Sequence, residues 1–214
     1  MNQSFKRNQS IKRKMTASLA ASLGLAFFPV PSAWAVPHVK MSAAADASWL
    51  PDKALTMTLG PQTDLAGYKM RLPAGYTADV KKDEATGPFK ARFFSLHKSD
   101  NVGPTMFVMA VSLSASAADA SHLPAMAERL FDGDGYTHGK KGLVKTQPQM
   151  GLINGLRVAR QYFKYMGADG HERHGFHYGV VDGAKRLLII VVDEEPYSTT
   201  SLPLAEAAVL TLRR

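Results

Sequence analysis

The sequence contains no cysteine, and this absence excludes several classes of protein. A bacterial lipoprotein carries its lipid on a cysteine at the first mature position, so this form of membrane anchoring is not available. Disulfide bonds, on which many small secreted domains depend, are excluded as well. The chain must therefore obtain its stability from an ordinary hydrophobic core, which a domain of this length is able to bury.

Acidic residues are missing from the first 35 positions, although this stretch holds five of the 26 basic residues. These five residues lie before an apolar run at 15–30, and Ala33-Trp34-Ala35 then supplies small residues where a signal peptidase reads. A basic start, an apolar run and a small-residue site are the layout of a secretory signal peptide. We therefore expect residues 1–35 to be removed, so that the mature chain begins at Val36.

A long hydrophobic span is also missing, because the apolar run is shorter than the ~20 residues that cross a bilayer. No pair of adjacent arginines precedes it, which favours general secretion over a twin-arginine route. We expect a periplasmic or secreted protein with no stable membrane anchor after signal cleavage.

A strong positive charge is missing once the leader is set aside. The formal charge of +8 falls to +3, because 21 basic residues remain against 18 acidic ones. Both signs are interleaved, as in Lys81-Lys82-Asp83-Glu84. No continuous basic surface is indicated, and nucleic acid is not expected as a partner.

The mature chain indicates one domain at 54–214 after a flexible Ala- and Ser-rich leader at 36–53. Turn signals separate short strands predicted at 54–59 and 68–72. A hairpin is predicted at 89–97 and 105–113, further strands at 143–150 and 156–166, and a second hairpin at 173–181 and 186–192. The spacing of apolar residues predicts helices at 121–131 and 201–212.

Two strands carry apolar residues on both faces. In the segment 105–113, Phe107, Met109 and Val111 alternate with another apolar set, and 187–192 is apolar throughout. Such strands need cover on both sides. We therefore predict an α+β fold, a central antiparallel sheet covered by helices in an α/β/α layered sandwich.

This pattern resembles the PsbP-type family of α/β/α sandwiches. The segment 68–76 (YKMRLPAGY) is similar to that family's opening strand and its Pro-x-Gly-aromatic turn. The 89–113 hairpin, the 123–131 helix, the 155–166 strand and the 173–192 hairpin before a terminal helix follow in the same order. The resemblance implies an accessory or binding role without a shared catalytic set, so it transfers no functional residue.

Three short motifs contain residue types that occur in metal or phosphate sites. His171, His174 and His177 lie within seven residues, but on a strand His171 and His177 would be about 20 Å apart and His174 would point to the other face. The loop 132–142 lacks the final glutamate of a calcium loop and the Lys-Ser/Thr of a phosphate loop. The adjacent acids 193–195 are typical of a solvated connection.

No Gly-x-Ser-x-Gly turn is present, and we predict no catalytic, cofactor-binding or metal-binding residue. The sequence favours an exported, noncatalytic binding or accessory protein of the bacterial cell envelope. Its partner would be an envelope protein or a small ligand, and no cofactor is expected. The alternative is an exported metal-dependent enzyme or metal carrier that uses the histidines at 171–177.

Overall fold

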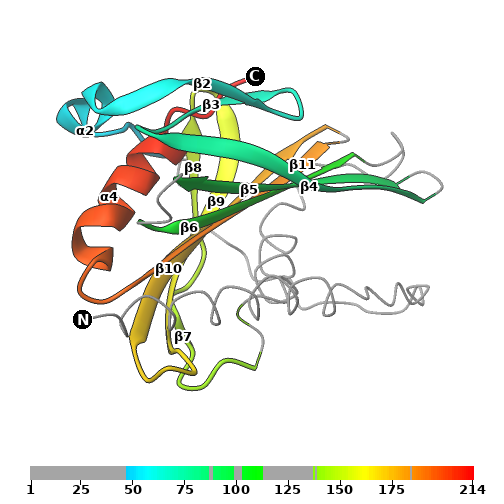
Figure 1. The fold of residues 1–214 in the computed structure, drawn as a ribbon. Coiled ribbons are helices and arrows are strands. Elements are labelled where there is room, and N and C mark those ends of the chain that lie inside the picture. Colours follow the sequence, from blue (N-terminus) through cyan, green and yellow to red (C-terminus); the bar gives the residue numbers. More distant parts are fainter. Residues whose placement is uncertain (1–46, 87–88, 99–102, 113–136, 138, 184) are drawn as a thin grey trace, which may run out of the picture.

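The computed structural model describes residues 47–86, 89–98, 103–112, 137, 139–183 and 185–214 (Figure 1). Nine strands form one large sheet in the order β1-β8-β9-β10-β11-β6-β5-β4, and β7 pairs with β9 beside β8. Every pairing in it is antiparallel except that of β1 with β8. The predicted α+β class is confirmed, as a mixed sheet with few helices in the described part of the chain.

The strands of the large sheet are β1 (Ala47–Ser48), β4 (Tyr76–Thr86), β5 (Phe89–Lys98), β6 (Thr105–Ser112), β7 (Val144–Lys145), β8 (Gln149–Ile153), β9 (Leu156–Met166), β10 (Glu172–Asp182) and β11 (Lys185–Glu194). A separate two-stranded sheet consists of β2 (Leu59–Leu65) and β3 (Tyr68–Pro73). The helices are α2 (Lys53–Met57) and α4 (Ser198–Val209).

The central strands bury apolar side chains on both faces, as the sequence predicted. In β11, Leu187, Ile189 and Val191 belong to one buried cluster, whereas the alternate residues 188, 190 and 192 belong to another. Because side chains alternate across a strand, the two clusters lie on opposite faces of the sheet. We refer to them as the first and second face.

The first face is covered by α4 and by the β2–β3 sheet, which lie side by side in Figure 1. Met70 and Leu72 of β3 are buried with Ala205 and Val209 of α4 in the same cluster. The helix predicted at 201–212 is thereby confirmed as a structural element. The last residues of the chain, which follow α4, lie against the small sheet. There Arg213 exchanges two backbone hydrogen bonds with Lys69 of β3.

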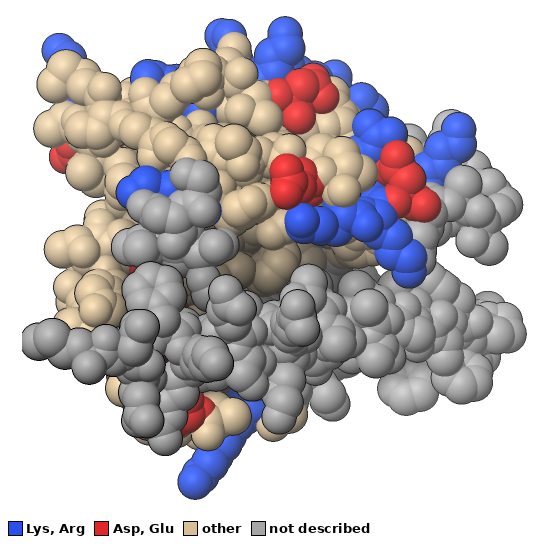
Figure 2. Space-filling view, in the orientation of Figure 1, with Lys and Arg blue, Asp and Glu red and all other residues tan. Residues whose placement is uncertain are grey.

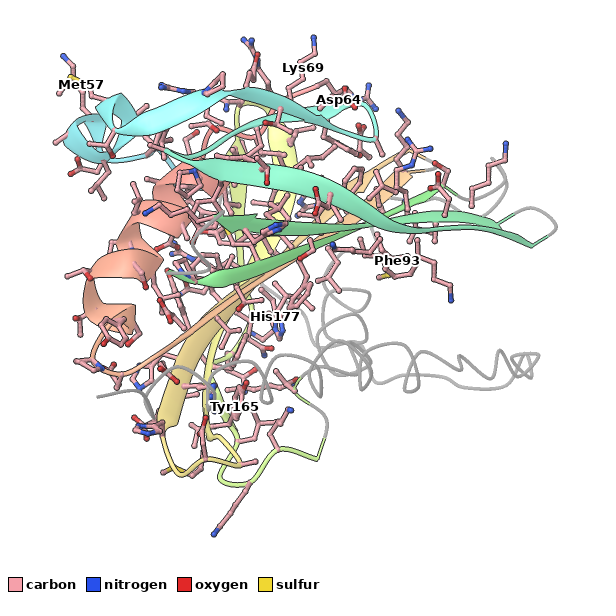
Figure 3. All side chains as sticks on the ribbon, in the orientation of Figure 1. Met57, Asp64, Lys69, Phe93, Tyr165 and His177 are labelled. Atoms are coloured by element: carbon pink, nitrogen blue, oxygen red, sulfur yellow. The ribbon has the colours of Figure 1, made fainter. Side chains whose placement is uncertain are left out.

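The second face carries Phe163 and Tyr165 of β9 together with the alternate residues of β11. Figure 3 shows Phe93, Tyr165 and His177 on this side, away from β2 and β3. The helix predicted at 121–131 lies outside the described residues. The described structure therefore contains the sheet and one of the two expected layers.

Two local predictions were wrong. The segment 54–59 is not a strand, because α2 occupies residues 53–57, and the Asp52 carboxylate caps it by accepting a hydrogen bond from the Leu55 amide. The strand predicted at 143–150 is divided into β7 and β8, with Pro148 between them. Proline has no amide hydrogen to donate to the neighbouring strand, which fits this interruption.

Two strands of the large sheet were not predicted, and neither was β2 of the small sheet, which covers residues 59–65. The first is β4, which forms one edge of the large sheet and carries Lys81, Lys82 and Asp83 among exposed positions. Its pairing with β5 shifts register between Val80 and Lys82. The second is β1, which lies within the stretch predicted as a leader.

The Trp49 side chain follows β1 and packs against Gly151 of β8, where an added Cβ would lie 2.4 Å from the indole. Residues 47–49, inside the stretch 36–53 that was predicted as a flexible leader, are therefore part of the fold.

Candidate functional site

A cavity of about 420 Å³ lies where the turn between β2 and β3 meets the ends of β4, β5, β6 and β11. Its apolar wall includes Ala66, the ring of Tyr68 and Ala110. Its polar wall includes Lys90, Ser112 and Lys185 and the pair of Asp83 and Arg92. In Figure 2, basic side chains gather with several acidic ones at this end of the molecule.

Strand register places Lys90, Ser112 and Lys185 in one row. Ser112 is the Cα partner of Lys90 on one side and of Lys185 on the other. Residues that face one another across neighbouring strands point to the same side of a sheet. The two ammonium groups and the serine hydroxyl therefore belong to one face, on three strands that are distant in sequence.

Arg92 and Asp83 form a bidentate ion pair in the same wall. The guanidinium donates from Nε at 2.7 Å and from Nη2 at 2.8 Å to the two carboxylate oxygens. This hydrogen bonding holds the pKa of Asp83 below its usual value. Both side chains are about half exposed, so the pair fixes geometry more than it adds stability.

Tyr68 closes the inner side of the cavity. Its ring is buried and its hydroxyl lies 3.4 Å from a carboxylate oxygen of Asp182. Burial, together with the neighbouring Asp182, raises the pKa of the phenol well above its usual range. The hydroxyl is therefore a neutral donor at physiological pH. The Lys185 ammonium lies 5.9 Å from the centre of the Tyr68 ring.

A second polar cluster joins α4 to the first face. One carboxylate oxygen of Glu206 accepts hydrogen bonds from Tyr162 at 2.6 Å, from Tyr178 at 2.7 Å and from Arg160 at 3.2 Å. The Arg160 guanidinium also lies 4.2 Å from the centre of the Trp49 ring. Since these donors converge on one acceptor, the cluster holds the helix, the sheet and the first described residues together.

The three histidines do not converge. His171 is exposed, His174 lies 2.6 Å from Glu172, and His177 is fully buried on the second face, 4.6 Å from the Phe163 ring. His171 precedes β10, whereas His177 lies in the middle of that strand. Among the described residues, no three His, Asp or Glu side chains are placed to hold a metal ion.

The other candidate motifs have structural contacts or lie elsewhere. Asp193 and Glu195 accept hydrogen bonds from Ser201 at 2.6 Å and from Ser198, and so connect the end of β11 to the start of α4. Most of the loop 132–142 lies outside the described residues. None of the described helices has the length and apolar character needed to cross a membrane.

The row of Lys90, Ser112 and Lys185 was missed by sequence reasoning. These residues come from three strands, and no local spacing connects them. The only signal available was that each stands at the end of a predicted strand. Recognising the row requires the register of both pairings, which the sequence pattern did not specify.

No protein-family profile and no curated protein matches the sequence. Solved structures show a similar fold. The solution structure of cyanobacterial PsbP (CyanoP) from Synechocystis sp. PCC 6803 matches 73% of this chain and 92% of its own, with a TM-score of 0.55 and 12% identity. The resemblance to a PsbP-type fold is thereby confirmed.

Two further structures match less well. A Bacteroides thetaiotaomicron VPI-5482 protein has a TM-score of 0.47 and 12% identity, over 72% of this chain and 48% of its own. LpqN, involved in cell envelope biogenesis of Mycobacterium tuberculosis, has a TM-score of 0.42 and 15% identity, over 72% and 98%. Similarity at this level supports no functional inference.

Proposed function

We propose that this chain with a PsbP-like fold is an exported, noncatalytic binding protein of the bacterial cell envelope. The observation that carries the proposal is the cavity at the sheet end, which combines an apolar wall with a few polar groups. This composition and a volume of about 420 Å³ are typical of small-molecule sites. Asp83 and Arg92 in its wall pair with each other, Lys90 and Lys185 are exposed, and the buried Arg186 donates hydrogen bonds to the backbone oxygens of Gly183 and Lys185.

The export part of the proposal rests on the leader. Residues 1–35 carry the three parts of a secretory signal, and cleavage after Ala35 would release a soluble domain into the periplasm or the medium. The proposal includes one domain that spans the predicted range 54–214, with the described residues 47–53 packed on it. The layered sandwich belongs to the same proposal, with the helix predicted at 121–131 covering the second face.

Native mass spectrometry of protein purified from the cell envelope tests this proposal. We expect the mass of a chain that begins at Val36, together with the added mass of a bound small molecule. Ser112→Trp should remove the adduct, because Ser112 is exposed at the cavity and a large ring there fills the space. Thr105→Trp is the matched control, since Thr105 is exposed at the opposite end of the same strand. An adduct that survives Ser112→Trp would place binding elsewhere.

A further inference from the structure

The charges around the cavity do not balance. Asp83 is the acidic residue of its wall, and Arg92 already holds both of its oxygens. Asp182 lies nearby, but it contacts the Tyr68 hydroxyl and the guanidinium of Arg214. Among the described residues, no carboxylate forms an ion pair with Lys90 or Lys185. Lys90 and Lys185 therefore line the cavity without a carboxylate partner in the described part of the chain, and Arg186 beside them hydrogen-bonds only to backbone oxygens there.

A glycine in the β2–β3 turn leaves space for the Lys185 ammonium. The Lys185 ammonium lies where a side chain on Gly67 would point, since an added Cβ there would be 3.1 Å from Nζ. Gly67 has a φ of 88°, a backbone conformation that side chains disfavour. The β2–β3 turn thus holds its glycine next to the ammonium and close to the Tyr68 ring. This places the charge of Lys185 at the boundary between the polar and the apolar wall.

The spacing of the row suits an oxyanion. Neighbouring strands are about 4.8 Å apart, so the Cα atoms of Lys90 and Lys185 are about 10 Å apart with Ser112 between them. Two lysine side chains are long enough to converge on a group that lies over the serine. The hydroxyl of Ser112 supplies a hydrogen-bond donor at the centre. The next residue of β6 on the same face is Ala110, which offers an apolar surface instead.

We propose that the ligand of this cavity carries a carboxylate or phosphate group, bound over Ser112 between Lys90 and Lys185, beside an apolar body that lies against Ala110 and the Tyr68 ring. This inference rests on the proposed function and adds the chemical class of the ligand to it. A carboxylate would come from a fatty-acid-like molecule, and a phosphate from a lipid-like monoester. Both share a charged end and an apolar end.

Titration of the envelope-purified protein with three probes of equal chain length tests the inference. Octanoate and octyl phosphate carry the charge, whereas 1-octanol does not. We expect at least one of the two anions to shift the amide signals of Ser112 and Lys185 in two-dimensional NMR and to bind more tightly than 1-octanol. The stronger anion identifies the head group. Added salt should weaken binding of the anion and leave the alcohol unaffected.

Variants assign the selectivity to the lysines. Lys90→Met and Lys185→Met should each weaken anion binding about two- to fivefold, the range for one exposed charge contact, and the double variant should weaken it further. Lys69→Met is the matched control, because Lys69 is exposed on β3 and points away from the cavity (Figure 3). Its affinity should equal that of the unchanged protein.

Two results would overturn the inference and leave the proposed function in place. One is binding of 1-octanol as tight as that of both anions, and the other is unchanged anion affinity in the double lysine variant. The proposed function fails separately if none of the three probes binds and the purified protein carries no adduct that Ser112→Trp removes. Thermal melting of each variant verifies that the fold is retained.

Discussion

The Tyr178 hydroxyl donates a 2.7 Å hydrogen bond to Glu206, and this contact connects the centre of β10 to α4. Tyr178 is fully buried, and its ring also meets that of Trp49 edge to face at 6.0 Å. The same carboxylate oxygen receives Tyr162 and Arg160. One acidic side chain of the terminal helix therefore accepts hydrogen bonds from three donors on two strands of the sheet.

Tyr178→Phe should lower the free energy of unfolding by about 1–3 kcal/mol, because it removes a hydrogen bond to a charged acceptor. Burial, and then the charge of Glu206, raise the pKa of Tyr178 above its usual value of 10.0. The phenol therefore contributes stability that is complete below about pH 10 and is lost as the pH rises further. Urea unfolding measured from pH 7 to 11 should show that the free energy of unfolding falls less with rising pH in the variant than in the unchanged protein. Tyr197→Phe, at an exposed position, is the control and should match the unchanged protein.

Asp169→Asn should change the acid side of the stability curve. Arg173 donates a 2.9 Å hydrogen bond to Asp169 and lowers the pKa of its carboxyl to about 2. A depressed pKa means that the contribution is present above the usual value near 4 and is lost as the pH falls towards 2. The variant should have a lower free energy of unfolding at neutral pH, and this free energy should fall less when the pH is lowered. Asp79→Asn, at a half-exposed carboxylate, serves as the control. Identical acid curves for Asp169→Asn and the unchanged protein would contradict the assignment.

Gly151→Ala should displace Trp49, because the new Cβ would lie 2.4 Å from the indole. Overpacking of this kind costs about 1–3 kcal/mol. In protein that has lost residues 1–35, Trp49 is the remaining tryptophan, so its emission should shift to longer wavelength. Gly60→Ala is the control, since its nearest neighbour would be at an ordinary 3.5 Å. Unchanged emission in Gly151→Ala would show that the ring does not lie on Gly151.

His177→Ala should lower the free energy of unfolding by about 2–4 kcal/mol, the range for removing a large buried side chain. The imidazole is fully buried against Phe163. His171→Ala changes an exposed residue of the same motif and should stay within about 0.5 kcal/mol. Chemical denaturation compares the two. Equal and small effects would mean that the second face is open at this position.

The long central strands could be predicted from sequence because burial on both faces leaves an unmistakable pattern. Leu187 to Val192 are all apolar, and their turn residues Asp182 and Gly183 define the hairpin. The edge strand β4 could not be predicted in this way. Its outward residues are charged, and within the described ranges it pairs with β5 alone, so the apolar alternation that identifies a strand is weak there.

The candidate site could not be predicted from local sequence patterns. Lys90 and Lys185 acquire their relation through Ser112, and that relation depends on the registers of two strand pairs. The same limit applied to the histidines. Alternation along a strand correctly predicted that His174 and His177 lie on opposite faces of β10. It did not reveal that His177 would be buried while His171 is exposed.

The charged edge strand β4 also bears on how copies of this protein meet. An open edge offers unpaired backbone groups to a neighbouring chain, and natural sheets discourage this with lysines and irregular register. If two β4 strands aligned antiparallel about Lys81 and Lys82, ammonium groups would face each other, and the register shift after Val80 would interrupt the ladder. Sheet continuation from copy to copy, the route to fibres, is therefore disfavoured along this edge.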